Sequence, residues 1–285
     1  MSLTIEHKDL EPVINAHAGN DLFKESLSLV QSPEDLINLI AHYIQFNGTF
    51  GSGVANLAGE IGCKPSLFRD PNEALLIFAD RSVEVASRVF FAAVDEFDDR
   101  DTAHLDTHRT LAQAALKGIG QYFGYTPTQL NDVISIIPET NDAIGRVRNG
   151  YAISQHVTEE VLFRAMGFHM GSEILADEEF QLMDDFFKQE YPELVEHLER
   201  TEVEINGNAH STYYWIRIHT TVEADHFASA AAGVNLALKY YAGTYQHEQV
   251  REWILEGFAD FAKVQEAFMR QLKNSFSEKL LAKAS

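Results

Sequence analysis

Apolar residues recur at every third or fourth position along most of the chain, which is the spacing of one face of an α-helix. Residues 36–44 and 254–272 show this pattern. A further series over residues 76–93 predicts one long helix. Strand-like alternation is confined to two short runs, at 201–205 and 133–137. The pattern therefore predicts an all-α protein with about seven to nine helices.

Several helix starts are marked by a capping residue followed by proline. Ser32-Pro33 and Thr126-Pro127 each place a hydroxyl side chain before a proline, which is typical of an N-cap and the first helical position. Asp70-Pro71 has the same form, so we expect a helix to begin there as well.

Nothing in the sequence divides the chain into separate domains. No Gly-, Ser- or Pro-rich linker is present, and residues 201–211 are expected to form a turn between helices. We therefore predict one helical domain over residues 1–285, with an N-terminal extension at 1–30, a bundle core at 31–275 and a tail at 276–285.

The composition is that of a folded and strongly acidic protein. Hydrophobic residues make up 45% of the chain, and 22 Lys+Arg against 43 Asp+Glu give a formal net charge of −21. Such a surface repels phosphate groups, so neither a nucleic acid nor a membrane is expected as a partner. The single cysteine, Cys63, excludes an intrachain disulfide, and the start MSLTIEHKDLEP lacks the features of a secretion signal. These features predict a cytoplasmic protein.

The strongest chemical signal is the segment His219-Thr-Thr-Val-Glu223-Ala-Asp-His226. At about 100° per residue, His219, Glu223 and His226 project from one face of a helix, whereas Asp225 points elsewhere and is expected at the surface. Two imidazoles and a carboxylate are typical ligands of iron, manganese or zinc. The alternative is two solvated histidines beside a surface acid. The same face continues through small residues, which leaves space for a neighbouring helix or a substrate: Ala230, Gly233 and Ala237.

Three more candidate ligands lie on apolar faces of other predicted helices. Glu96 follows the series Ala86, Val89, Ala93, and Glu173 shares a face with methionines and Phe180. An acid on such a face is costly unless it is neutralised or binds a metal. His108 comes directly after a cap at Asp106 or Thr107 and begins the face that contains Leu111.

Two of these candidates, Glu96 and His108, have an alternative interpretation. Glu96 could be a solvated helix end, and His108 could be a capping or core histidine, with His104 or Asp101 as a competing ligand. Glu178 and Glu179 have polar neighbours and are expected on a solvated face. Four other residues are assigned no role: His156, Glu159, Glu160 and His169.

Taken together, these residues resemble the metal-ligand pattern of the haem-oxygenase-like di-iron oxidase superfamily, close to its CADD-like branch. Asp95-Glu96-Phe97 followed by His108-Arg-Thr-Leu is similar to the first half of that pattern, and Gly171-Ser-Glu173 is similar to its central glutamate. The segment from His219 to His226 matches its final motif residue by residue. Asp98-Asp99-Arg100 stands where the family usually has glycines, which keeps His104 and Asp101 open as alternatives.

The resemblance covers about residues 30–275 and implies a haem-oxygenase-like up-down bundle of about seven core helices. It implies two iron ions held by Glu96, His108, Glu173, His219, Glu223 and His226, with O2 as co-substrate. The implied activity is that of an iron-dependent oxidoreductase acting on a small organic substrate, such as a fatty acid, an amino acid or an aromatic precursor. The resemblance also implies a homodimer. It assigns no further catalytic residue.

The main alternative is a metal-free enzyme of the TenA/PqqC-like kind, or a small-molecule-binding protein, on the same fold. Cys63 is a weak candidate for the nucleophile of such an enzyme because it comes just before Lys64-Pro65 in an expected loop. A haem oxygenase would need an early proximal histidine, such as His17 or His42. The aromatic run Tyr213-Tyr214-Trp215 is expected in the core, with a substrate wall or a redox relay as the alternative.

Overall fold

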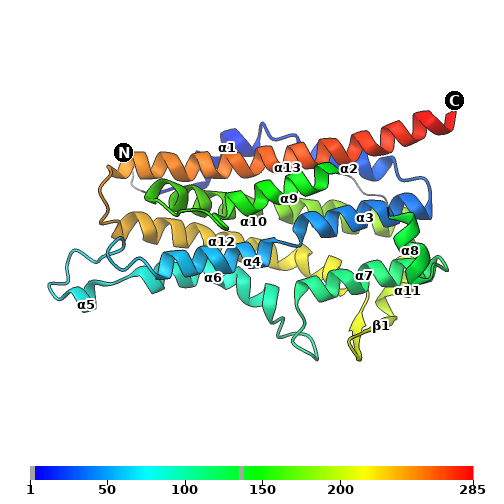
Figure 1. Cartoon of the computed structure of the whole chain (residues 1–285), viewed down its shortest axis with the longest axis horizontal. Coiled ribbons are helices and arrows are strands. Elements are labelled where there is room, and N and C mark those ends of the chain that lie inside the picture. The colour runs from blue at the N-terminus through cyan, green and yellow to red at the C-terminus, as the bar shows by residue number, and fades with distance from the viewer. Residues whose placement is uncertain (1–3, 135–137, 285) are drawn as a thin grey trace.

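The computed structural model describes residues 4–134 and 138–284, and most of these residues are helical. The longer helices run along the long axis of the molecule (Figure 1). They are α3 (Pro33–Asn47), α4 (Phe50–Gly62), α6 (Ser82–Phe97), α7 (His108–Tyr122), α9 (Pro138–Gly150), α10 (Glu159–Glu190), α12 (Tyr214–Tyr240) and α13 (His247–Ala284). The shorter helices are α1 (His7–Ile14), α2 (Gly19–Ser28), α5 (Leu76–Ala79), α8 (Pro127–Val133) and α11 (Pro192–Glu199).

The described residues thus form thirteen helices, which is more than the sequence predicted. The excess comes from the shorter helices, which have too few turns to show a repeating apolar face. The prediction of a mostly helical protein is confirmed. Residues 276–284, expected as a tail, continue α13. Within the described part of the chain, no helix has the length and apolar character needed to cross a membrane.

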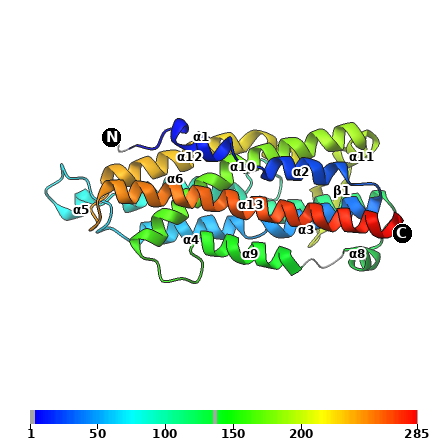
Figure 2. The same ribbon diagram turned by 90° about the horizontal axis from the view of Figure 1, so that it is seen from above.

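Helix α10 has the most extensive packing in the bundle, against α12 and α13. Helix α13 also contacts α2 and α9 (Figure 2). Two glycines bring the backbones of α10 and α13 together, because a Cβ on Gly167 or on Gly257 would lie 1.9 Å from a carbonyl oxygen of the other helix. The apolar face predicted over 254–272 is buried in this contact, with Phe258 and Phe268 almost inaccessible to solvent.

The small residues that follow the histidine motif pack against a helix. Ala230 and Ala237 are buried, and a Cβ on Gly233 would lie 3.0 Å from the Cβ of Arg88 on α6. Of the two roles that the sequence left open for this face, the structure shows the packing of a neighbouring helix.

Two of the three predicted helix starts are confirmed. Ser32 caps α3 by accepting a hydrogen bond from the Asp35 backbone N–H (3.2 Å), and Thr126 caps α8 in the same way. The start at Asp70-Pro71 is wrong, because Asp70 Oδ1 accepts hydrogen bonds from the backbone and side chain of Asn72 and closes a turn instead. Competition of this kind is typical of Asp side chains.

The single helix expected over residues 76–93 is also wrong. It is divided into α5, which ends at Ala79, and α6, which begins at Ser82. The Arg81 backbone N–H donates to the Phe68 carbonyl (3.0 Å), so the chain turns back here toward the preceding loop. Helix α5 lies at one end of the molecule, and its Ile77 side chain is 82% exposed (Figure 1).

The turn expected over residues 201–211 is an antiparallel β-hairpin of β1 (Glu202–Ile205) and β2 (Asn208–Ser211). Asn206 and Gly207 occupy its tip with φ values of 52° and 81°, which suit these two residue types. The all-α prediction therefore needs this one correction. Residues 135–137 of the other alternating run lie outside the described residues.

Candidate metal centre and its cavity

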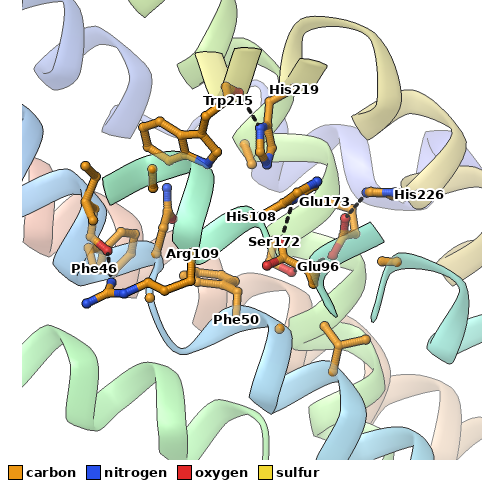
Figure 3. Close-up of a pocket in the computed structure, with 18 of the residues that line it drawn as sticks. Phe46, Phe50, Glu96, His108, Arg109, Ser172, Glu173, Trp215, His219 and His226 are labelled. Carbon is orange, nitrogen blue, oxygen red and sulfur yellow. Dashed lines mark hydrogen bonds and ion pairs between the residues drawn. The ribbon is translucent and has the colours of Figure 1, made fainter. Parts of the chain in front are cut away.

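A cavity of about 250 Å³ lies between α3, α4, α6, α7, α10, α12 and α13. Five of the six ligands predicted from the sequence line this cavity, and Figure 3 shows how they lie. They are Glu96, His108, Glu173, His219 and His226. The sixth, Glu223, lies on α12, but its side chain is outside the described residues. Four helices, α6, α7, α10 and α12, thus bring their candidate ligands to one place, while the role of these residues as ligands stays a prediction.

Local structure explains how Glu96 and His108 reach the cavity. His108 is the first residue of α7, and Thr107 caps this helix by accepting a hydrogen bond from the Thr110 backbone N–H (3.0 Å). Glu96 lies in the last turn of α6, opposite Gly51 of α4. A Cβ on Gly51 would come within 2.9 Å of the Glu96 Cβ, so glycine leaves room for this side chain.

Glu96, His108 and His219 form the tightest group of candidate ligands among the described residues. One donor atom from each lies within 4.8 Å of the others. Donor atoms bound to one metal ion are separated by roughly 3–4 Å, because each lies about 2 Å from the ion. These three side chains can therefore hold one metal ion after only small movements.

The imidazole of His219 is held in the form that a metal requires. Its Nδ1–H donates to the Trp215 carbonyl oxygen (2.7 Å), which leaves the lone pair on Nε2. Phe180 stacks on the ring, with centroids 4.1 Å apart. Burial, together with the nearby charge of His108, lowers the pKa of His219 well below its ordinary value, so this ring is neutral.

His108 lies between two carboxylates. Its Nδ1 is 3.4 Å from Glu96 Oε1 and its Nε2 is 3.5 Å from Asp99 Oδ2. Burial opposes the charged form, but these two carboxylates outweigh it and raise the pKa of His108 to about 10. Neither ring nitrogen has a hydrogen bond of normal geometry among the described residues. Buried nitrogens in this condition are suited to bind a cation once the proton is lost.

Glu173 and His226 form a second group in the same cavity. Glu173 Oε2 lies 3.4 Å from His226 Nδ1, and Glu173 Oε1 lies 3.0 Å from His169 Nδ1. Burial would raise the pKa of Glu173, but the two histidines hold it below its usual value. The other ring nitrogen of His226 donates to Asp95 Oδ2 (3.0 Å). A carboxylate behind a histidine is a common arrangement around metal ligands.

The donor set includes one group of three residues that could hold a metal ion, namely Glu96, His108 and His219. A second pair of donors, Glu173 and His226, lines the same cavity with its nearest atoms 3.4 Å apart, and imidazole and carboxylate donors are of the types that bind iron, manganese or zinc. The rings of His219 and His226 are also oriented by acceptors behind them, at the Trp215 carbonyl and at Asp95.

Sequence reasoning did not identify Asp95, Asp99 or His169 as part of this site. Asp95 and Asp99 belong to the acidic run 95–101, which has the composition of a solvated helix end. The signal for His169 was its position four residues before Glu173, which places both on one face of α10.

The competing candidates lie elsewhere. His104 is exposed, and its ring packs against His210 at 5.8 Å. Asp101 is exposed as well, and neither residue lines the cavity. Asp225 is at the surface, as expected.

Aromatic side chains form most of the remaining cavity wall. Trp215 lines the cavity, so it forms part of the wall as well as the core, whereas the buried Tyr213 hydroxyl donates to Asp184 (2.7 Å). Arg109, beside Gly48, is the only Lys or Arg among the lining residues that the structure describes. The other aromatic wall residues are Phe46, Phe50, Phe97, Phe180 and Phe261.

The expectation that Glu179 lies on a solvated face is wrong. Glu178 is exposed, but Glu179 is only 1% exposed and lines the cavity. The Tyr43 hydroxyl donates to Glu179 Oε2 (2.5 Å), and the Gln265 amide donates to Oε1. Burial raises the pKa of Glu179 to about 7, although both hydrogen bonds act in the opposite direction. Its neighbours in sequence are polar, so only the packing of α3 and α13 against α10 reveals its burial.

Comparisons with known proteins do not assign the chain to a family. No family model matches the sequence, and no curated protein matches it.

Proposed function

We propose that this protein is a non-haem di-iron oxidase or oxygenase on a haem-oxygenase-like bundle, which uses O2 to oxidise a small organic substrate. The observation that supports this proposal is the convergence of five candidate ligands from α6, α7, α10 and α12 on one largely aromatic cavity. The ligand pattern in the sequence that led to the same residues supports it independently.

In this proposal Glu96, His108 and His219 hold one iron ion. Glu173 and His226 hold the other, and the sequence pattern adds Glu223 to the set. Bound iron would supply the redox chemistry with O2 that protein side chains lack. Imidazole and carboxylate donors also suit manganese and zinc, so iron is proposed because of the resemblance to the di-iron oxidases.

The surrounding residues have defined tasks in this proposal. The Trp215 carbonyl and the Asp95 carboxylate fix the rings of His219 and His226, so that little reorganisation accompanies metal binding. His108 gives up its proton when a cation binds at its group, because a metal ligand must be a neutral imidazole. Phe50, Phe180 and the other aromatic wall residues hold the substrate and exclude water from the site.

A second candidate is a metal-free enzyme or a small-molecule-binding protein on the same fold. One observation favours it: the buried acids and histidines already pair with one another, as His108 does with Glu96 and Glu173 does with His169. Charges satisfied in this way do not require a metal ion for their burial.

Metal analysis distinguishes the two candidates. We expect protein produced with iron to hold about two iron ions per chain, as the two ligand groups imply, and to show an O2-dependent change in absorbance after anaerobic reduction. His219→Ala should lose much of the iron. The matched control His104→Ala removes an exposed histidine outside the cavity and should keep it. Wild-type protein that takes up no iron would contradict the proposal and leave the metal-free candidate.

A further inference from the structure

Glu179 is a buried acid that lacks a cationic partner. Its neighbours from the packed helices are Tyr43 on α3 and Gln265 on α13, and both are neutral donors. Among the described residues, no Lys, Arg or His side chain forms an ion pair with it. Carboxylates buried in proteins are normally paired, because the cost of removing a lone charge from water is large.

The residues that pack around Glu179 supply no positive charge either; Arg109 and His108 line the same cavity, but among the described residues neither forms an ion pair with Glu179. Gln265 also donates to Asn20 Oδ1 (3.1 Å), and Asn20 donates to the exposed acid Glu178 (2.6 Å). His17 lies beside Gln265, but burial lowers the pKa of His17 below its ordinary value and keeps the ring neutral. Among the described residues, the charged group that acts on Glu179 is the Glu178 carboxylate, which has the same sign.

The carboxylate of Glu179 can accept further hydrogen bonds. An ionised carboxylate offers about four lone-pair positions to donors. Tyr43 and Gln265 each use one oxygen of Glu179, so positions remain on both oxygens. Because Glu179 lines the cavity, a small molecule inside it can approach this group.

We propose that Glu179 binds the ammonium group of a primary amine, whose aromatic or alkyl body lies against the cavity wall and extends toward the candidate metal ligands. The inference deepens the proposed function and rests on it in one respect, because it names the chemical class of the substrate. The amine site itself consists of this chain's own residues and can be tested without iron.

Charge selects an amine over the other small molecules that fit an aromatic cavity. An ammonium supplies both hydrogen-bond donors and the missing positive charge, whereas an alcohol supplies only a donor and a carboxylate meets a charge of its own sign. The net charge of −21 also attracts cations from solution.

The spacing along α10 places the amine site next to the candidate metal centre. Glu173 and Glu179 are six residues apart on one helix, which corresponds to a rise of about 9 Å. Phe180 follows Glu179 and stacks on His219, so an aromatic ring of the cavity wall contacts one of the candidate ligands. A molecule held at Glu179 would therefore present its body to the histidines.

Binding of small probes to the metal-free protein tests this site. At pH 8 we would titrate 2-phenylethylamine, 2-phenylethanol and 3-phenylpropionate into wild-type protein by calorimetry, with thermal unfolding as a second readout. We expect the amine to bind at least roughly tenfold more tightly than the other two, which share its ring but lack its charge. Equal binding of amine and alcohol, or no binding of the amine, would overturn the proposal.

Two neighbouring glutamates provide a matched pair of variants. Glu179→Gln removes the buried charge at nearly constant size and should weaken amine binding at least roughly tenfold. Glu178→Gln removes an exposed charge one residue away and should bind the amine like wild type. An amine that binds Glu179→Gln as well as wild type is bound elsewhere, and the proposal is then wrong.

Measuring the iron content of the same variants tells whether the amine site at Glu179 is wrong or the proposed oxidase function is wrong. Glu179→Gln should take up iron like wild type, because Glu179 is not one of the candidate ligands. His219→Ala should lose iron; because its ring lies in the same cavity, amine affinity is compared only among metal-free wild type, Glu179→Gln and Glu178→Gln. Amine binding without iron uptake would refute the oxidase alone, and iron uptake without amine binding would refute the amine site alone.

Discussion

Helix α10 carries two buried glutamates that face the same cavity in opposite electrostatic conditions. Glu173 lies between His169 and His226, and its pKa is held below the ordinary value despite its burial. Glu179 has the neutral donors Tyr43 and Gln265, and burial raises its pKa to about 7. Both side chains are less than a tenth exposed.

The difference shows that burial alone does not determine the charge of an acid in this protein. The desolvation cost is present at both positions, and the sign of the shift follows from whether the partners can carry a positive charge. Glu173 belongs to a network in which every acid has a histidine, and such a network can exchange protons for metal ions. Glu179 belongs to a hydrogen-bond network that contains no cation. A buried carboxylate without a cation is expected at a site that binds a positively charged ligand.

The largest expected change in stability comes from Glu173→Gln in the metal-free protein. Removing the charge leaves buried His169 without its acid and His226 with Asp95 alone, so we expect a loss of about 3 kcal/mol in the free energy of unfolding at neutral pH. Urea denaturation would measure it. The lowered pKa of Glu173 stabilises the fold above the ordinary value of 4.5 and ceases to do so as the pH falls below it, so the deficit should shrink in acid. A deficit that is the same at all pH values would contradict the ion-pair explanation.

The same substitution at Glu179 should act in the opposite direction. Its folded pKa of about 7 exceeds the ordinary value of 4.5, so the fold loses stability as the pH rises from 4.5 to 7. Glu179→Gln cannot ionise and should therefore be more stable than wild type at pH 8, by about 1–3 kcal/mol. The advantage should disappear near pH 4.

Denaturation at several pH values measures this effect, with Glu178→Gln as the control. Glu178 is exposed and should show only a small change. A Glu179→Gln protein that is less stable than wild type at pH 8 would show that the carboxylate is better compensated than its neutral partners suggest.

The sequence predicted those parts of the site that depend on a single helix. His219 and His226 face the cavity together because helical geometry alone determines their relative direction. Glu96, His108 and Glu173 were predicted from acids and a histidine on apolar faces, and the structure places all three in the same cavity.

The missed residues depend on contacts between helices. Glu179 looks solvated beside Glu178, and its burial follows from Tyr43 and Gln265, which are distant in sequence. The division of the helix expected over 76–93 has the same origin, because a hydrogen bond to Phe68 turns the chain at Arg81. Periodicity reports which face of a helix is apolar, but not which partner covers the remaining positions.

A smaller effect tests the packing behind Glu96. Gly51→Ala places a methyl group 2.9 Å from the Glu96 Cβ, so the side chain must move and we expect a loss of about 1–2 kcal/mol. Gly59 on the same helix has no atom within 4 Å of such a methyl group, so Gly59→Ala should stabilise the protein by about 0.5–1 kcal/mol. Thermal unfolding of both variants gives the comparison. Similar gains at the two positions would show that Glu96 is not confined by α4.

The smallest expected change concerns the acid behind His226. Asp95→Asn keeps the size of the side chain and one acceptor for the His226 ring, but it removes a charge that is about one-third exposed. We therefore expect little change in stability and roughly tenfold weaker binding of Fe²⁺, measured by anaerobic titration of the metal-free protein. Asp101→Asn, which alters an exposed acid of the same acidic run 95–101 outside the cavity, should bind Fe²⁺ like wild type. If both variants bind equally well, Asp95 does not tune His226. If both are weakened equally, the effect comes from the net charge of the acidic run 95–101, and metal binding in the cavity depends on charge at a distance as well as on direct contacts.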